Sequence, residues 1–286
     1  MKVKILAIVC LGLLSLKAYS QDENAAIELY NQVVQAVQTE DFASAITKAN
    51  EAYELVKDGS DELKTNLEQL IPKLYLNKAN KSLSDSKFEE AAKEFAQTSE
   101  VAKKFNNADV QKDADNSILK VYLSEADNLY KADNFDGAIA AFDKALAIDS
   151  TNAQAYLIKA AAYAKKEDNK NAIATFGKLL EVSKATENEA MQKQAATQLS
   201  ALYVKESNAA AKNKKWDDVI SNAEKSLEYK PEGNASALKL RDMGNLQLGN
   251  SLKDSNKTKA CQHLKKVTSD EGYKATAKQL LTALGC

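Results

Sequence analysis

Two stretches in the middle of the chain carry the same residue pattern, and the second follows the first by 34 positions. They read NFDGAIAAFDKALAID and DNKNAIATFGKLLEV, with Ala138 aligned on Ala172 and Phe142 aligned on Phe176. A period of 34 residues is the length of one helix–turn–helix repeat. In each stretch the alanine and the phenylalanine four residues later lie on one face of a helix. Because alanine is small, a second helix can pass close by, so the pattern predicts tightly crossed pairs of helices.

The two stretches resemble tetratricopeptide (TPR) repeats, in which small and aromatic residues recur at fixed positions of a 34-residue unit. The clearest units are residues 119–152 and 153–186. The first supplies the matching residues Tyr122, Ala126, Phe135, Ala138, Phe142 and Ala145, and the second supplies Tyr156, Ala160, Tyr163, Ala172 and Phe176. Three positions depart from the family pattern: Leu179 replaces an alanine, Asn169 replaces an aromatic residue and Ser150 replaces the closing proline.

The resemblance implies an all-α fold, namely a right-handed TPR-like α-solenoid of about six helical hairpins plus a C-terminal capping helix. Residues 21–286 would form a single superhelical domain, with the cap at 271–286. The composition agrees, because the chain has only two prolines and nine glycines, the residues that favour β-turns. With 44% hydrophobic residues, a chain of 286 residues can bury a large core.

Small residues equivalent to Ala138 are predicted at Ala45 and Ala91, at intervals of 46 and 47 residues. The surplus over the central period, about 12 residues, is near three helical turns, so a longer first helix keeps its apolar face in phase. We therefore expect lengthened first helices, such as one over residues 109–131, within one continuous stack.

Local signals predict further boundaries. Pro72 follows leucines at helical spacing, which predicts a kink or a short preceding helix. Gly59 is expected at the C-terminal cap of the helix before it. Residues 183–213 are predicted to form another lengthened helix, followed by helices over 216–229 and 271–284.

Residues 1–20 have the composition of a secretory signal peptide. Lysines precede an apolar run, and the sequence AYS then offers small residues for cleavage before Gln21. One alternative is a short membrane anchor, although the run is shorter than the ~20 residues of a span. A lipoprotein modified at Cys10 is disfavoured, because that cysteine follows a valine inside the apolar run. We expect an exported protein, periplasmic or outer-membrane-associated, with no direct membrane span after cleavage.

Two cysteines remain beyond the predicted signal peptide, Cys261 and Cys286. In an exported chain such a pair suggests a disulfide. It would close a loop of about 25 residues and stabilise the fold by about 3–4 kcal/mol in the chain-entropy model. The alternative is two unpaired thiols, with Cys261 simply filling a small position on its helix.

The sequence lacks the patterns of an enzyme, a metal site or a nucleic-acid reader. It has one histidine, His263, which is predicted to be a lone solvated side chain. Arg241 is the only arginine, whereas nucleic-acid readers depend on arginine for bidentate contacts. The formal net charge is −1 and becomes more negative when the lysines of the signal peptide are removed. We therefore predict no catalytic, cofactor-binding or metal-binding residues and no nucleic-acid partner.

The family resemblance implies that the first helix of each hairpin lines a concave groove. Mapping the groove positions onto this sequence gives the predicted partner-binding residues Tyr30, Lys73, Asn80, Lys120, Asp127, Tyr130, Lys131, Gln154, Lys165, Asn208 and Lys212. The alternative is that they are ordinary solvated residues. The lysine–asparagine clamp that some TPR proteins use for a C-terminal carboxylate is absent, because Leu157 and Ala161 occupy its positions in the second clear repeat.

The function that this resemblance implies is a non-enzymatic protein–protein interaction scaffold of the bacterial cell envelope, which binds a partner protein or peptide in its groove. The alternative is a periplasmic chaperone or a secretion or assembly accessory that holds envelope proteins transiently. A third class is an enzyme whose site has no recognisable motif. One stoichiometric partner would favour the scaffold, whereas many weak clients would favour the chaperone.

Overall fold

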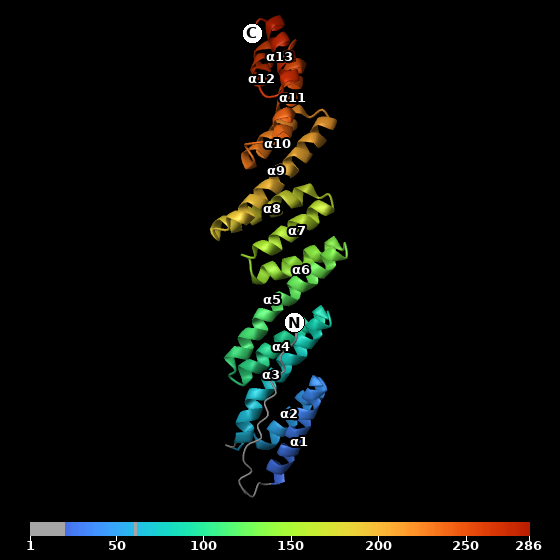
Figure 1. The fold of residues 1–286 in the computed structure, drawn as a ribbon, viewed down its shortest axis with the longest axis vertical. Coiled ribbons are helices and arrows are strands. Elements are labelled where there is room, and N and C mark those ends of the chain that lie inside the picture. Colours follow the sequence, from blue (N-terminus) through green and yellow to red (C-terminus); the bar gives the residue numbers. More distant parts are fainter. Residues whose placement is uncertain (1–20, 60–61) are drawn as a thin grey trace. The chain divides into compact units, whose positions relative to one another are not determined.

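The computed structural model describes residues 21–59 and 62–286, so the predicted signal peptide over residues 1–20 lies outside the described residues. Within those ranges the regular elements are thirteen α-helices, and no strand occurs there. The helices (Figure 1) are α1 (Gln21–Gln38), α2 (Phe42–Val56), α3 (Glu62–Ser84), α4 (Phe88–Lys104), α5 (Ala108–Lys131), α6 (Phe135–Ile148), α7 (Ala153–Lys165), α8 (Asn169–Ala185), α9 (Glu189–Lys212), α10 (Trp216–Tyr229), α11 (Ala235–Leu252), α12 (Lys257–Lys265) and α13 (Glu271–Leu284). The predicted all-α fold is therefore confirmed.

The chain divides into two compact units, one ending at Val121 and the other beginning at Tyr122, so that α5 contributes to both. In the first unit α1 packs on α2, α2 on α3 and α3 on α4. In the second unit each helix from α6 to α13 packs on the next. The helices follow one another as six hairpins, α1–α2 to α11–α12, and α13 comes after the last of them. These hairpins match the predicted repeats, while a continuous stack across both units stays a prediction.

The alanines that define the repeat lie where helices cross. Ala126, Ala138, Ala160 and Ala172 are all 0% exposed. Ala126 and Ala138 belong to one core cluster, and Ala160 and Ala172 belong to another, so each pair joins the two helices of its hairpin. Leu179 replaces a family alanine and is also fully buried. The close crossings predicted from the sequence are therefore present in both central hairpins.

Substituting leucine for Ala172 is expected to destabilise the second unit by about 1–3 kcal/mol, because the added atoms overpack a filled helix crossing. Ala174→Leu is the matched control, since Ala174 lies two residues along the same helix and is exposed. Chemical denaturation followed by circular dichroism measures both variants. Equal stabilities for the two would contradict a close crossing at Ala172.

Turns between the two helices of a hairpin share a local design. In the α7–α8 turn, Glu167 adopts a left-handed conformation with φ 60°, and Asp168 then caps α8. The Asp168 side chain accepts a hydrogen bond from the Asn171 amide at 3.1 Å, which satisfies one free N–H at the helix start. Hydrogen bonds from the Asn171 side chain and amide lower the pKa of Asp168. The α5–α6 turn repeats this arrangement, with a left-handed residue followed by the cap Asn134.

Three local expectations need correction. Helix α3 continues through Pro72, which is buried inside it, so no separate short helix precedes the proline. Helix α2 ends at Val56 with Lys57 as its cap, and Gly59 instead donates its amide to the Val56 carbonyl at 3.0 Å. The helix predicted over 183–213 begins only at Glu189, because its first residues complete α8. In contrast, the helices predicted over 216–229 and 271–284 have the bounds of α10 and α13.

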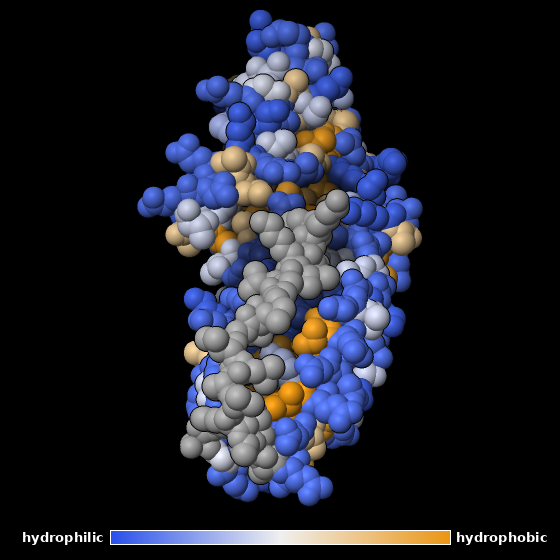
Figure 2. Space-filling model, turned by 60° about the horizontal axis from the view of Figure 1, so that its bottom comes forward, coloured by the Kyte–Doolittle hydropathy of each residue, from blue (hydrophilic) through white to orange (hydrophobic). Residues whose placement is uncertain are grey.

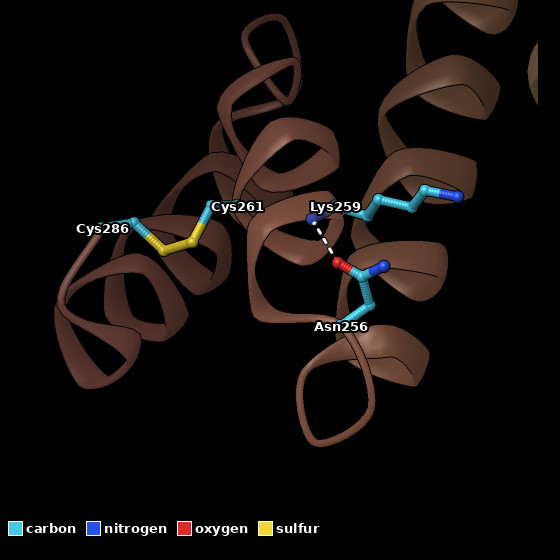
Figure 3. The surroundings of a disulfide bond; sticks show 4 residues. All are labelled: Asn256, Lys259, Cys261 and Cys286. Carbon is cyan, nitrogen blue, oxygen red and sulfur yellow. Dashed lines mark hydrogen bonds between the residues drawn. A yellow bond between two sulfur atoms is a disulfide. The ribbon is translucent and has the colours of Figure 1, made fainter.

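Helix α13 is attached to the last hairpin at both of its ends. Near its start, the fully buried Asp242 of α11 accepts hydrogen bonds from the backbone amides of residues 268, 269 and 270, at 3.1, 2.5 and 2.8 Å. Beyond its other end, Cys286 is joined to Cys261 of α12, with their Cα atoms 6.0 Å apart (Figure 3). Asn256 fixes the start of α12 by accepting a hydrogen bond from the Lys259 amide at 3.0 Å. We call Asp242 and these two cysteines the clasp.

Candidate functional site

An open hollow of about 600 Å³ lies in the second unit, on the side formed by α5, α7 and α9. Four of the predicted partner-binding residues line it together, Asp127, Tyr130 and Lys131 of α5 and Lys165 of α7. They were assigned from equivalent repeat positions. The structure brings them to one surface because α5 and α7 are the first helices of successive hairpins.

The floor of the hollow was not predicted from the sequence. Its remaining lining residues are Leu157, Ile158, Ala161, Ala164, Phe176, Gln194 and Gln198. The hollow is deepest over α7, because Ala161 and Ala164 present only methyl groups to it. The neighbouring Ala160 instead faces the α8 crossing, in the same core cluster as Ala172. The signal that could have revealed this floor is the run of alanines in α7, which leaves the part of that helix around Ala161 and Ala164 with only small side chains toward the hollow.

Tyr130 belongs to both the hollow and the core. Its ring lies edge-on to that of Phe135, with ring centroids 5.6 Å apart, and it packs against the cluster of Ala126 and Ala138. Edge-to-face contacts of this kind stabilise a fold by about 0.5–1.5 kcal/mol. Truncating Tyr130 would therefore affect stability as well as binding, and the predicted groove role alone does not describe this residue.

The other predicted residues lie outside the hollow. In the first unit, Lys73, Asn80 and Lys120 are exposed, whereas Tyr30 is half-buried against the core cluster of α1 to α3. In the second unit, Gln154, Asn208 and Lys212 are exposed. The side-chain amide of Asn208 donates to the carbonyl of Val204 at 2.9 Å, within its own helix. The structure thus groups four of the eleven predicted residues around one cavity, and the partner-binding role of the others stays a prediction.

Two ion pairs hold α7, which forms the floor, against α6. Lys159 pairs with Asp143 at 2.5 Å, and Lys166 pairs with Asp136. Surface pairs of this kind stabilise by less than about 1 kcal/mol each, so they fix position more than they add stability. The hydrogen bond that Lys166 donates to the Asp136 carboxylate raises the pKa of Lys166, so this lysine stays charged at neutral pH.

Charge around the hollow is uneven. Lys131 and Lys165 occupy the last turns of α5 and α7 and stand at equivalent repeat positions. Asp127 lies one helical turn before Lys131, but the equivalent position before Lys165 holds Ala161. Because successive first helices run in the same direction, both lysines lie along one edge. That edge therefore carries positive charge beside an apolar floor.

The described parts of the chain offer neither a metal-ligand cluster nor a membrane-spanning helix. Among the described residues no group of three or more His, Cys, Asp or Glu side chains could hold a metal ion. None of the helices from α1 to α13 is long and apolar enough to cross a membrane. Hydrophilic residues dominate the face shown in Figure 2, and hydrophobic residues appear there only in small separate areas.

The single histidine differs from its predicted solvated state. His263 is half-buried, and its Nδ1 lies 3.0 Å from the side-chain oxygen of Asn245, a buried residue of α11. Burial, followed by the nearby charge of Lys266, lowers the pKa of His263. Its contacts make it part of the packing between α11 and α12.

No protein-family model matches the chain, and no curated protein matches its sequence. Several solved structures resemble it. MamA is 20% identical over 69% of this chain and 96% of that protein, with a TM-score of 0.32. The C-terminal part of a TPR repeat-containing protein from Cytophaga hutchinsonii is 16% identical over 90% of this chain and 88% of that one, with a TM-score of 0.30. YrrB, a TPR protein with an unusual peptide-binding site, is 22% identical over 56% of this chain and 91% of its own, with a TM-score of 0.23.

The chain's own geometry shows a repeat of helical hairpins. Helical hairpins follow one another along the sequence, and the two central ones recur at 34 residues. Small residues are buried where the helices of a hairpin cross, and aromatic residues such as Phe142 and Phe176 fill the space beside them. These features agree with the helical hairpins that the resemblance to tetratricopeptide repeats predicts for the centre of the chain.

Proposed function

We propose that the chain is a non-enzymatic scaffold that binds a segment of a partner protein in the hollow of the second unit. The observation that carries this proposal is the composition of the hollow. Leu157 and Ile158 contribute apolar surface to it, while lysines and glutamines stand around this floor. Sites that bind ligands combine an apolar floor with a few polar groups in this way, and the volume of the hollow is within the range they occupy.

An extended polypeptide segment suits the hollow better than a compact ligand, because the hollow spans the first helices of three successive hairpins, α5, α7 and α9. Gln194 and Gln198 lie one turn apart on α9, and each side-chain amide can donate and accept a hydrogen bond. Such amides can pair with the backbone groups of an extended segment, while its side chains enter the apolar floor. Binding would bury the floor, at roughly 25 cal/mol for each Å² of apolar surface removed from water.

We further propose that the scaffold is exported and works in the periplasm or at the outer membrane. Support comes from the signal-peptide composition of residues 1–20, and the pairing of Cys261 with Cys286 fits an oxidising compartment. Sequencing the N-terminus of the protein purified from its native cell tests this proposal. A mature chain that begins at Gln21 is expected. A chain found in the cytoplasm with its first residues intact would refute it.

Filling the hollow is expected to abolish partner binding without unfolding the protein. In Ala161→Leu the larger side chain occupies space that the partner needs, and position 161 is only half-buried, so overpacking of the core is avoided. A photo-crosslinking amino acid at Gln194 should capture a partner in the native cell, and Ala161→Leu should remove that crosslink. Loss by about tenfold or more corresponds to at least about 1.4 kcal/mol of binding free energy.

Ala174→Leu again provides the control, because it adds the same side chain at an exposed position of the second helix of the hairpin. That variant should crosslink as the unmodified protein does. If Ala161→Leu and the control crosslink equally, the hollow is not the binding site. A single captured protein supports a scaffold, whereas a broad set of weakly captured proteins supports the chaperone alternative.

A further inference from the structure

We propose that the hollow selects polypeptide segments in which a large apolar side chain stands next to an acidic residue. This inference rests on the proposed function, because it specifies the class of segment that enters the same site. It is carried by the position of two lysines relative to the apolar floor, and by the absence of a matching carboxylate beside one of them.

The apolar preference follows from α7. Leu157 and Ile158 supply aliphatic surface, and the methyl groups of Ala161 and Ala164 leave the space above the helix open. Buried polar groups without a partner are costly, so a floor of this kind favours a side chain such as leucine, isoleucine or phenylalanine. A small or polar side chain would leave the floor partly hydrated and bind less well.

The acidic preference follows from the lysine edge. Lys131 and Lys165 both line the hollow and are both exposed, at the C-terminal ends of α5 and α7. The negative charge of Asp127 offsets part of the charge of Lys131. In α7 the position one turn before Lys165 is Ala161, so the hollow keeps a net positive charge at this edge. A carboxylate next to the apolar side chain would lie near these lysines, whereas a basic residue there would be repelled.

The site therefore differs in sign from the chain as a whole, whose formal net charge is −1. General attraction between the protein and basic partners cannot produce an acidic preference, and the two effects have opposite signs. An acidic preference, if it is measured, must come from the residues around the hollow. Because both lysines are exposed, the preference should weaken as the salt concentration rises.

A phage-displayed library of random peptides tests the inference with the complete second unit in place, using the full chain as bait. Peptides selected by the unmodified protein are expected to be enriched in Leu, Ile or Phe next to Asp or Glu. A selected acidic peptide is then synthesised, and its affinity is measured by fluorescence anisotropy. For the double variant Lys131→Glu with Lys165→Glu, the affinity should fall about tenfold, because two attractive contacts become repulsive.

The matched control is Lys184→Glu. Lys184 is also an exposed lysine in the last turn of a helix, but α8 is the second helix of its hairpin, and Lys184 does not line the hollow. The charge change therefore places the same unfavourable carboxylate at a helix C-terminus without altering the site. Circular dichroism melts of all variants establish that each is folded before binding is compared.

Each outcome has one meaning. Acidic enrichment that is lost in the double lysine variant and kept in Lys184→Glu supports the inference. If peptides are selected and Ala161→Leu abolishes their binding, but they show no acidic enrichment or ignore the lysine changes, this inference is overturned and the proposed function stands. If no peptide is selected, or if Ala161→Leu binds the selected peptides unchanged, the proposed function fails and this inference fails with it.

Discussion

Replacing Asp242 with alanine is expected to destabilise the second unit by about 3 kcal/mol, the cost of removing a buried charged acceptor together with its hydrogen bonds. The carboxylate is fully buried and accepts backbone amides from three consecutive residues, 268 to 270. Arg241 approaches the other carboxylate oxygen at 3.4 Å. With alanine at this position the three amides lose their common acceptor, and the loop that leads into α13 is no longer fixed.

Two further variants separate this role from a general effect of charge. Asp242→Asn keeps one oxygen as an acceptor for the loop amides and should recover part of the loss. Asp254→Ala removes a carboxylate from the exposed turn after α11 and should change the stability by no more than about 0.5 kcal/mol. Urea denaturation measures the stabilities, and hydrogen exchange should show the amides of α13 opening first in Asp242→Ala. An Asp242→Ala protein as stable as Asp254→Ala would refute the role of the clasp.

The sequence predicts the hairpins well because their signal is periodic. In the two central hairpins the buried alanines and the phenylalanines after them recur at 34 residues, so one misread residue does not displace a helix. Outside the central hairpins, the helix predicted over residues 216–229 also has the bounds of α10. At Pro72 the short preceding helix was the wrong alternative, because a buried proline can be accommodated inside a helix that its neighbours hold in place. The alternative of a kink at Pro72 stays a prediction.

Features that depend on packing could not be predicted. Glu167 and Asp133 adopt left-handed backbone conformations, which glycine adopts most easily. These conformations are needed only because the second helix of each hairpin turns back sharply on the first. Asp242 reads in the sequence as an ordinary surface carboxylate, and its burial depends on a loop 26 residues away. Likewise, the predicted groove residues were assigned from repeat positions. The depth of the hollow instead comes from Ala161 and Ala164, whose small side chains matter only because no larger neighbouring side chain covers them.

Removing the bond between Cys261 and Cys286 is expected to destabilise the fold by about 3–4 kcal/mol in the chain-entropy model, since the bond closes a loop over a sequence separation of 25. The protein purified from its native cell should show, by mass spectrometry without reduction, a linked peptide pair about 2 Da lighter than the two thiols. Cys261→Ser with Cys286→Ser should melt as the reduced protein does. Two freely alkylated thiols in that protein would mean that the bond does not form in the cell.

The two parts of the clasp should not act independently. In α13 only Ala277 is buried, and the other apolar residues of the helix are partly buried against the cluster of Leu246 and Leu264. Asp242 holds one end of the helix and the cysteine pair holds the other. Once either end is released, α13 can separate from Leu246 and Leu264. Releasing the other end then breaks fewer remaining contacts and costs less stability. The triple variant should therefore lose less stability than the separate losses predict, by an interaction energy of about 0.5–3 kcal/mol. Additive losses would show instead that Asp242 and the disulfide stabilise different parts of the fold.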